Sequence, residues 1–219
     1  MKYRLAIFDL DGTVLDTLDD LFDAANAALF MGGYQTRTKE EICSFVGDGI
    51  KMLIERALPK GVGEGELARV LKLFTDYYAA HCADKTKPYL GICEMLGDLR
   101  AKGVKTAVLS NKADFATQAL AKTYFAGLFD AVAGEREREG VPKKPAPDGV
   151  HLLLRACDVD AADAVYIGDS DVDVKTAANA GLDAILVSWG FRSREQLLAN
   201  GAKVIADTPK ELQALILNT

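Results

Sequence analysis

Short apolar runs alternate with helical patterns along most of the chain, and this alternation restricts the fold more than any other feature of the sequence. Each run ends in polar or glycine residues, as expected for buried strands that lead into turns; the runs are residues 4–8, 104–109, 164–167 and 184–187, with weaker ones at 129–133 and 203–206. The helical patterns cover residues 91–102, 114–122, 148–157 and 171–180. Strands that alternate with helices form a parallel sheet covered on both faces. The sequence therefore predicts an α/β fold with a Rossmann-like, three-layer core around a parallel sheet.

Residues 16–84 interrupt the alternation, because helical periodicity is the only pattern that they contain. Apolar residues recur there at the spacing of one helix face, as do Leu18, Leu21, Phe22 and Ala25. Residues 59–65 predict a turn between two helices, and residues 85–89 predict a linker. We therefore expect a core domain of residues 1–15 and 85–219, and a small all-helical domain of residues 16–84 inserted after the first strand.

The charge and the apolar pattern exclude several classes of partner. A net charge of -6 argues against nucleic-acid binding, which needs basic patches. The same charge would repel a phosphorylated substrate unless a cation lay between substrate and protein. No apolar run approaches the roughly 20 residues of a membrane-spanning helix. The four cysteines form no CxxC pair and no signal peptide is evident, so we expect a cytoplasmic protein.

Polar residues close three of the expected strands: Asp9, Ser110 and Asp169. Ligands of open parallel sheets bind beyond the carboxyl ends of the strands, so these residues are candidates for one site. Asp9 and Asp11 lie two residues apart, and an extended backbone would point both carboxylates to the same side. Such a pair suits a nucleophile with an acid–base partner, or a site for a hard metal ion. The alternative is an acidic turn with solvated side chains.

Two further segments are candidates for binding an anion. Ser110 and Asn111 precede a helix expected to begin near Ala113, where a hydroxyl, an amide and free helix N–H groups can bind an anion together. Capping of that helix is the alternative. In the segment 142–147, prolines fix the backbone around Lys144, so its ammonium could neutralise phosphate charge. The alternative is a solvated basic loop.

The segment after residue 167 is rich in acidic side chains. Asp169 lies at a strand end, and Asp173 follows one helical turn later, so both can share a face. Mg²⁺ prefers carboxylate oxygens and keeps several waters, so a few protein ligands suffice. Capping of the following helix by Ser170 or Asp171 is the alternative.

Together these segments resemble the four motifs of the haloacid dehalogenase superfamily of phosphohydrolases, and the resemblance covers essentially the whole chain. The matching residues, in order, are Asp9-Leu10-Asp11-Gly12-Thr13, Ser110, Lys144, and Gly168-Asp169 with Asp173. The resemblance implies that Asp9 attacks phosphorus to form an aspartyl-phosphate, while Asp11 protonates the leaving oxygen and later deprotonates water. It also implies roles for the remaining residues. Mg²⁺ would be held by Asp9, the backbone carbonyl of Asp11 and Asp169, with support from Asp173, and the phosphoryl oxygens by Ser110, Asn111 and Lys144.

Within the superfamily, the helical insertion resembles the small cap domain of the phosphoglycolate phosphatase-like subgroup. The segments that carry this resemblance are residues 16–21, 45–49 and 189–193, with Thr17 where serine is frequent. Gly47, Asp48 and Gly49 are expected to form a tight loop that binds substrate, or else simply a loop that starts a helix. Lys51 and Arg192 are candidates for binding a substrate carboxylate, or else surface charges.

The first hypothesis for function is a phosphatase acting on a small phosphorylated metabolite, with 2-phosphoglycolate the first choice and Mg²⁺ the cofactor. The alternatives are a phosphatase for a nucleotide, sugar phosphate or pyrophosphate, a phosphosugar mutase, and a protein that only binds a phosphorylated ligand. We expect a monomer or a homodimer that binds neither nucleic acid nor membrane.

Overall fold

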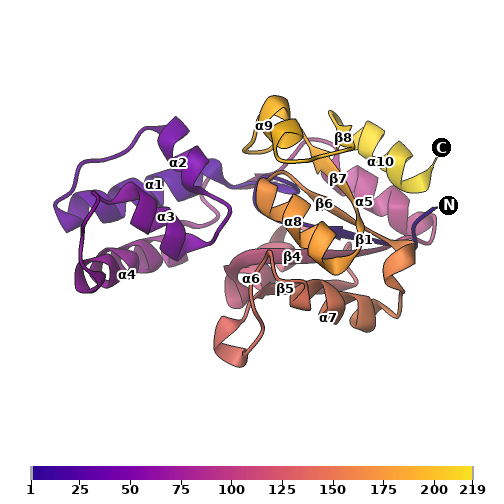
Figure 1. Cartoon of the computed structure of the whole chain (residues 1–219), viewed down its shortest axis with the longest axis horizontal. Coiled ribbons are helices and arrows are strands. Elements are labelled where there is room, and N and C mark those ends of the chain that lie inside the picture. Colours follow the sequence, from indigo (N-terminus) through magenta and orange to yellow (C-terminus); the bar gives the residue numbers. More distant parts are fainter. Residues whose placement is uncertain (1, 219) are drawn as a thin grey trace. The chain divides into compact units, whose positions relative to one another are not determined.

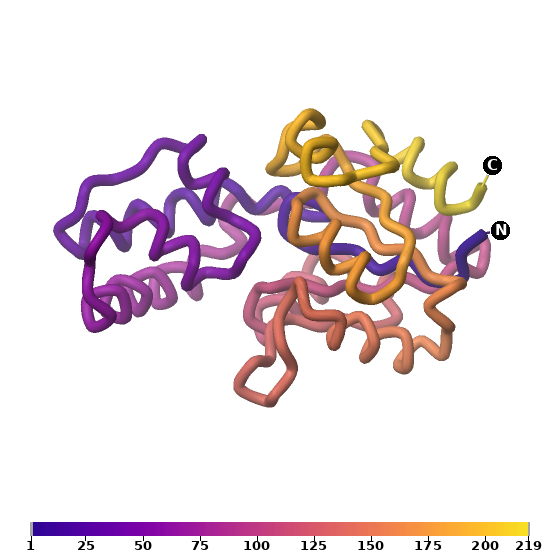
Figure 2. The backbone as a smooth tube through the Cα atoms, in the orientation of Figure 1, coloured from indigo at the N-terminus to yellow at the C-terminus, as the bar shows by residue number. Residues whose placement is uncertain are grey.

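The computed structural model describes residues 2–218, which divide into two compact units. The core unit comprises residues 2–15 and 88–218, and the cap unit comprises residues 16–87. In Figure 2 the backbone passes from the core unit into the cap unit and back again. The observed division after residue 87 lies three residues beyond the expected one after residue 84. Asp20 ties residues 85–86 to the cap unit, because its carboxylate accepts hydrogen bonds from the backbone N–H groups of Lys85 and Thr86.

The core unit contains one six-stranded sheet with the order β5-β4-β1-β6-β7-β8. Its strands are β1 (Leu5–Phe8), β4 (Lys105–Ala113), β5 (Ala131–Glu135), β6 (Ala164–Gly168), β7 (Asp183–Val187) and β8 (Ile205–Ala206). All neighbouring strands pair in parallel, and Ile7 of the central strand β1 lies opposite Ala107 on one side and Tyr166 on the other. The predicted α/β fold around a parallel sheet is confirmed.

Helices cover both faces of this sheet, because side chains alternate across each strand. Ala6 and Phe8 pack against the face covered by α5 (Ile92–Ala101), α6 (Asp114–Tyr124) and α10 (Pro209–Leu217). Leu5 and Ile7 pack on the opposite face, against α7 (Asp148–Cys157) and α8 (Asp171–Ala180). The short helix α9 (Arg194–Ala199) packs against the β7–β8 end through Leu197. Figure 1 shows the sheet between these layers.

Strand β8 begins at Ile205 rather than at residue 203, and two further strands differ from the prediction. The run 104–109 was expected to end before Ser110, but β4 continues to Ala113, with a shift of register between Leu109 and Ala113. Strand β5 lies two residues later than the expected range of 129–133. Polar residues rarely extend a buried strand unless each has a partner, and the partners of β4 come from distant parts of the chain.

The cap unit is helical, and its helices are α1 (Leu18–Gly32), α2 (Lys39–Phe45), α3 (Ile50–Ala57) and α4 (Glu64–His81). Apolar side chains such as Leu29, Ile54 and Phe74 are fully buried among them. Helix α4 begins at Glu64, so the predicted turn at 59–65 ends earlier than expected. Two short strands, β2 (Leu15–Asp16) and β3 (Lys87–Pro88), pair where the chain enters and leaves the unit. None of the helices within residues 2–218 has the length and apolar character needed to span a membrane.

Candidate active site

Three aspartates meet at the carboxyl edge of the core sheet. Asp9 directly follows β1, Asp169 follows β6, and Asp173 lies in the first turn of α8. One carboxylate oxygen from each lies within 4.8 Å of the others, and all three residues are buried. The structure thus brings together acidic residues that lie far apart in the sequence, as strand ends of a parallel sheet allow.

Lys144 lies between two of these carboxylates. Its Nζ is 2.8 Å from Oδ1 of Asp9 and 2.8 Å from Oδ1 of Asp173, and the side chain is 3% exposed. Burial alone would lower the pKa of the Lys144 ammonium, but the charges of Asp173 and Asp9 outweigh burial and raise this pKa well above its usual value. The two carboxylates therefore favour the charged form of Lys144, and the interpretation as a solvated loop did not anticipate this burial.

Asn111 holds the backbone around Lys144. Its amide Nδ2 donates to the carbonyl oxygen of Lys144 at 3.1 Å, and its Oδ1 accepts from the Lys144 N–H at 2.8 Å. Helix α6 begins only at Asp114, and its cap residue Ala113 makes no side-chain cap, so neither Ser110 nor Asn111 caps this helix. The alternative of helix capping is therefore wrong, and the Asn111 side chain instead positions the lysine.

Asp169 lies in a tight cradle. Oδ1 accepts from the Thr13 hydroxyl at 3.2 Å, and Oδ2 accepts from the Phe191 N–H at 2.7 Å. A Cβ added to Gly12 would lie 2.4 Å from Oδ2 of Asp169. A Cβ added to Gly190 would lie 2.3 Å from Cβ of Asp169, so only glycine fits at either position. Burial, followed by the nearby charge of Asp173, raises the pKa of the Asp169 carboxyl to about 7.

Asp173 is already surrounded by donors. Its Oδ2 accepts from the N–H of Asp169 at 3.2 Å, from the N–H of Ser170 at 3.1 Å and from the Ser170 hydroxyl at 2.7 Å. Its Oδ1 accepts from Lys144 and, at 3.3 Å, from the Tyr166 hydroxyl. These contacts include the capping box of α8, so the capping alternative for Ser170 is confirmed, and the metal-site role of this segment stays a prediction. Asp173 is thus placed to orient its neighbours.

Asp11 contacts a residue that the sequence did not single out. The Nζ of Lys112 is 2.9 Å from Oδ1 and 3.1 Å from Oδ2 of Asp11, and the lysine side chain is 5% exposed. Lys112 directly follows Ser110 and Asn111, which are candidates because they are polar and lie at a strand end. The sequence does contain a signal for Lys112, because it is a lysine in the same polar segment, at the sheet edge where ligands bind. The Ser110 hydroxyl accepts from the Lys112 N–H at 3.1 Å, which fixes this turn of the strand.

The set of donors fits a hard divalent cation. Four carboxyl groups (Asp9, Asp11, Asp169 and Asp173) lie close to only two ammonium groups, so acidic groups outnumber basic ones here. Burial, followed by the charges of its neighbours, raises the pKa of the Asp9 carboxyl well above its usual value, although Lys144 opposes this shift. A bound cation would relieve this crowding. Asp9 and Asp169 are the carboxylates best able to hold it, because both oxygens of Asp173 already accept several hydrogen bonds.

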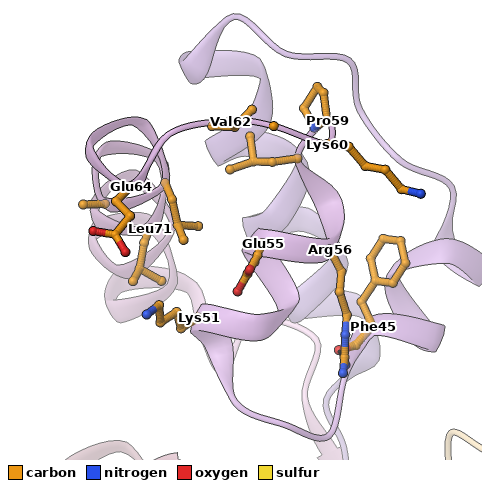
Figure 3. Close-up of a pocket in the computed structure, with 13 residues that line it drawn as sticks. Phe45, Lys51, Glu55, Arg56, Pro59, Lys60, Val62, Glu64 and Leu71 are labelled. Atoms are coloured by element: carbon orange, nitrogen blue, oxygen red, sulfur yellow. Dashed lines mark hydrogen bonds between the residues drawn. The ribbon is translucent and has the colours of Figure 1, made fainter.

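The predicted substrate loop belongs to the cap unit. Gly47, Asp48 and Gly49 lie between α2 and α3, and the Asp48 carboxylate is 2.5 Å from a guanidinium nitrogen of Arg56. Lys51 lines a cavity of about 810 Å³ within the same unit. In Figure 3, Lys51 and Glu55 face this cavity.

Known proteins resemble this chain over most of its length. Residues 6–187 match the family model of haloacid dehalogenase-like hydrolases. A phosphoglycolate phosphatase from Vibrio parahaemolyticus is 31% identical, and the match covers 97% of this chain and 96% of the relative. One from Psychrobacter arcticus is 35% identical, with 87% of this chain and 86% of the relative covered.

Solved structures give a similar result. The crystal structure of a candidate phosphoglycolate phosphatase from Lactobacillus delbrueckii subsp. bulgaricus has a TM-score of 0.94 and 41% identity, and the match covers 99% of each chain. CbbY from Rhodobacter sphaeroides, solved in complex with phosphate, has a TM-score of 0.77 and 26% identity, with 96% of each chain covered.

Proposed function

Because the chain belongs to the haloacid dehalogenase-like hydrolase family, we propose that it is a Mg²⁺-dependent phosphatase that hydrolyses 2-phosphoglycolate through an aspartyl-phosphate on Asp9. The placement of Asp9 is the observation that carries the proposal. Its Oδ1 accepts from the Leu10 N–H at 2.7 Å and contacts Lys144 at 2.8 Å, which leaves Oδ2 as the oxygen for attack on phosphorus. A carboxylate held through one oxygen is oriented for nucleophilic attack through the other.

Two displacements at phosphorus complete the reaction. In the first, Oδ2 of Asp9 bonds to phosphorus, the bond from phosphorus to the ester oxygen breaks, and the leaving oxygen takes a proton from Asp11. In the second, a water oxygen bonds to phosphorus and gives a proton to Asp11, while the bond from phosphorus to Asp9 breaks and phosphate is released. Lys144 and Ser110 would bind the phosphoryl oxygens. Asn111 would support this binding, because it holds the backbone of Lys144.

Asp9, Asp169 and the backbone carbonyl of Asp11 would hold Mg²⁺, with Asp173 orienting the Asp169 backbone through its hydrogen bonds. When bound, the ion neutralises charge on the phosphoryl group. The core unit would carry the chemistry, and substrate binding by the loop of Gly47, Asp48 and Gly49 in the cap unit stays a prediction.

The choice of 2-phosphoglycolate is supported by relatives that carry the name phosphoglycolate phosphatase and match nearly the full chain at 31% and 32% identity. The four free cysteines fit a reducing compartment, so we place the activity in the cytoplasm. A sugar bisphosphate is the second candidate, since CbbY, solved with xylulose-1,5-bisphosphate, is 26% identical with a TM-score of 0.75.

A panel of phosphate esters assayed with and without Mg²⁺ tests this proposal. The panel should include 2-phosphoglycolate, xylulose-1,5-bisphosphate, hexose phosphates, nucleotides and pyrophosphate, with released phosphate as the readout. We expect 2-phosphoglycolate to give the highest kcat/KM, and we expect no activity after removal of divalent ions. An isomerised sugar phosphate with little free phosphate would indicate a mutase instead, and full activity after chelation would contradict the metal assignment.

A further inference from the structure

Lys112 is a buried lysine at the carboxyl end of β4. Lys112 and Lys144 are the two lysines in residues 2–218 that are buried. A buried ammonium group costs several kcal/mol in lost hydration unless charged partners compensate it. Lysine is almost never fully buried unless it is paired: Lys144 pairs with Asp9 and Asp173, and Lys112 pairs with Asp11.

The backbone of Lys112 is fixed on both sides. Its N–H donates to the Ser110 hydroxyl at 3.1 Å, and its carbonyl oxygen accepts from the Thr117 hydroxyl at 3.2 Å. The shift of register in β4 lies in the same stretch, between Leu109 and Ala113. The lysine therefore extends from a backbone held on both sides, which lowers the entropic cost of ordering it around a ligand.

The position of Asp11 determines which part of a substrate would meet this ammonium. Asp11 must come within hydrogen-bond distance of the ester oxygen to give it a proton. Nζ of Lys112 is 2.9 Å and 3.1 Å from the two oxygens of Asp11, so it lies within two hydrogen bonds, about 6 Å, of the ester oxygen. Lys112 is thus on the side of the leaving group.

The leaving group of 2-phosphoglycolate carries a carboxylate one carbon away from the ester oxygen. Standard bond lengths put a carboxylate oxygen about 3 Å from that ester oxygen, so a leaving group that extends toward Asp11 can bring this oxygen within hydrogen-bond reach of Nζ. Resting on the proposed function, we propose that Lys112 binds this carboxylate, sharing its ammonium between substrate and Asp11. The site would thereby select phosphate esters of 2-hydroxy acids. This assignment differs from Lys51 and Arg192, the candidates suggested by the sequence.

Selectivity between two esters tests the role of Lys112. The esters are 2-phosphoglycolate and ethyl phosphate, which has a methyl group in place of the carboxylate, and the quantity measured is the ratio of their kcat/KM values. We expect Lys112→Gln to lower this ratio at least about tenfold, mainly by raising KM for the carboxylate-bearing ester, because a charged hydrogen bond is lost. Lys112→Arg, which keeps a cation, should restore part of the ratio. Lys122→Gln, at an exposed lysine in α6, removes the same charge and should leave the ratio as in the wild type.

Several results would overturn the inference. An equal loss for both esters in Lys112→Gln would mean that the lysine acts only through Asp11. A loss of the ratio in Lys51→Gln but not in Lys112→Gln would assign the carboxylate to the cap unit. If Lys112→Gln does not fold, the wild-type protein still tests the inference. A wild-type preference for 2-phosphoglycolate over ethyl phosphate below about tenfold contradicts a dedicated carboxylate site. The proposed function fails separately, if the wild type hydrolyses neither ester in the presence of Mg²⁺.

Discussion

Asp9 and Asp11 lie two residues apart, yet different cations hold them. Lys144 contacts one oxygen of Asp9, whereas Lys112 contacts both oxygens of Asp11. A nucleophile needs a free oxygen, and a group that carries protons needs to stay close to the leaving group. The unequal contacts of the two carboxylates suit this division of roles, which sequence spacing alone could not reveal.

Replacement of Asp9 tests the nucleophile. We expect Asp9→Asn to fold and to lose at least about a thousandfold in kcat, because an amide cannot form the phosphoenzyme. Steady-state kinetics with 2-phosphoglycolate measure the loss, and circular dichroism verifies the fold. Asp98→Asn, at an exposed position in α5, is the matched control and should retain activity. Turnover by Asp9→Asn near the wild-type rate would show that another residue attacks phosphorus.

The pKa of Asp169 predicts how magnesium binding depends on pH. Burial and the charge of Asp173 raise this pKa to about 7, so below pH 7 the metal-free protein holds a proton where the ion would bind. Protons and Mg²⁺ therefore compete, and the half-saturating Mg²⁺ concentration should rise by up to about tenfold per pH unit below 7. Titration of activity at pH 6, 7 and 8 measures this change. Calorimetry at pH 6.5 should detect proton release on Mg²⁺ binding, and equal affinities at pH 6 and pH 8 would contradict the prediction.

At the scale of elements, the helices were easier to predict than the end of β4. The bounds of α7 (Asp148–Cys157) and α8 (Asp171–Ala180) agree with the sequence patterns, because apolar periodicity and capping residues are local signals. The polar end of β4 has no local signal for a strand. In its buried position Asn111 pairs with the backbone of Lys144 and Lys112 pairs with Asp11, and both contacts depend on the tertiary fold.

The turn after β1 predicts a difference between two glycine substitutions. Gly12 has φ +84° and a Cβ there would lie 2.4 Å from Asp169, whereas Gly127 has φ +76° and nothing within 4 Å. Gly127→Ala should lower the free energy of unfolding by about 1–2 kcal/mol through backbone strain alone. Gly12→Ala should cost at least about 1 kcal/mol more through the clash, and should also weaken Mg²⁺ binding. Urea denaturation and Mg²⁺ titration measure both effects; equal costs with unchanged Mg²⁺ affinity would contradict the cradle around Asp169.

At the scale of the molecule, sequence reasoning could bring together the acidic residues at the sheet edge, but not the side chains around the loop of the inserted unit. The carboxyl ends of parallel strands lie at the same edge of a sheet, so the sequence alone could place Asp9 and Asp169 close together. Lys51 and Asp48 belong to an inserted unit, whose periodicity predicts helices but not which side chains meet a ligand. The ion pair of Asp48 with Arg56 and the cavity lined by Lys51 follow from packing within that unit.

Two units with separate cores should respond separately to a mutation. Asp20 is buried in the cap unit and accepts hydrogen bonds from Lys85 and from the N–H and hydroxyl of Thr86. Asp20→Ala should destabilise the cap unit by about 2–4 kcal/mol, because buried donors lose their acceptor. Asp23→Ala, which removes only the partly exposed ion pair with Lys85, should cost less than about 1 kcal/mol.

Two spectroscopic probes distinguish the units in that experiment. Trp189 is the single tryptophan and lies in the core unit, where its indole N–H donates to the Thr13 carbonyl, so its fluorescence reports on the core. Circular dichroism at 222 nm reports on helices of both units. We expect Asp20→Ala to shift part of the dichroism transition in urea while the fluorescence transition stays in place. Equal shifts of both signals would mean that the chain unfolds as one cooperative unit.

The paired strands β2 and β3 mean that the chain leaves and re-enters the core at neighbouring points. An insertion with such close ends can be lengthened, shortened or exchanged without changing the order of the sheet strands or moving Asp9 from the end of β1. Over evolution, one catalytic framework could therefore acquire new substrates by changing a single segment. For protein engineering, the same arrangement marks residues 16–87 as a cassette, into which the helical insert of a relative could be grafted.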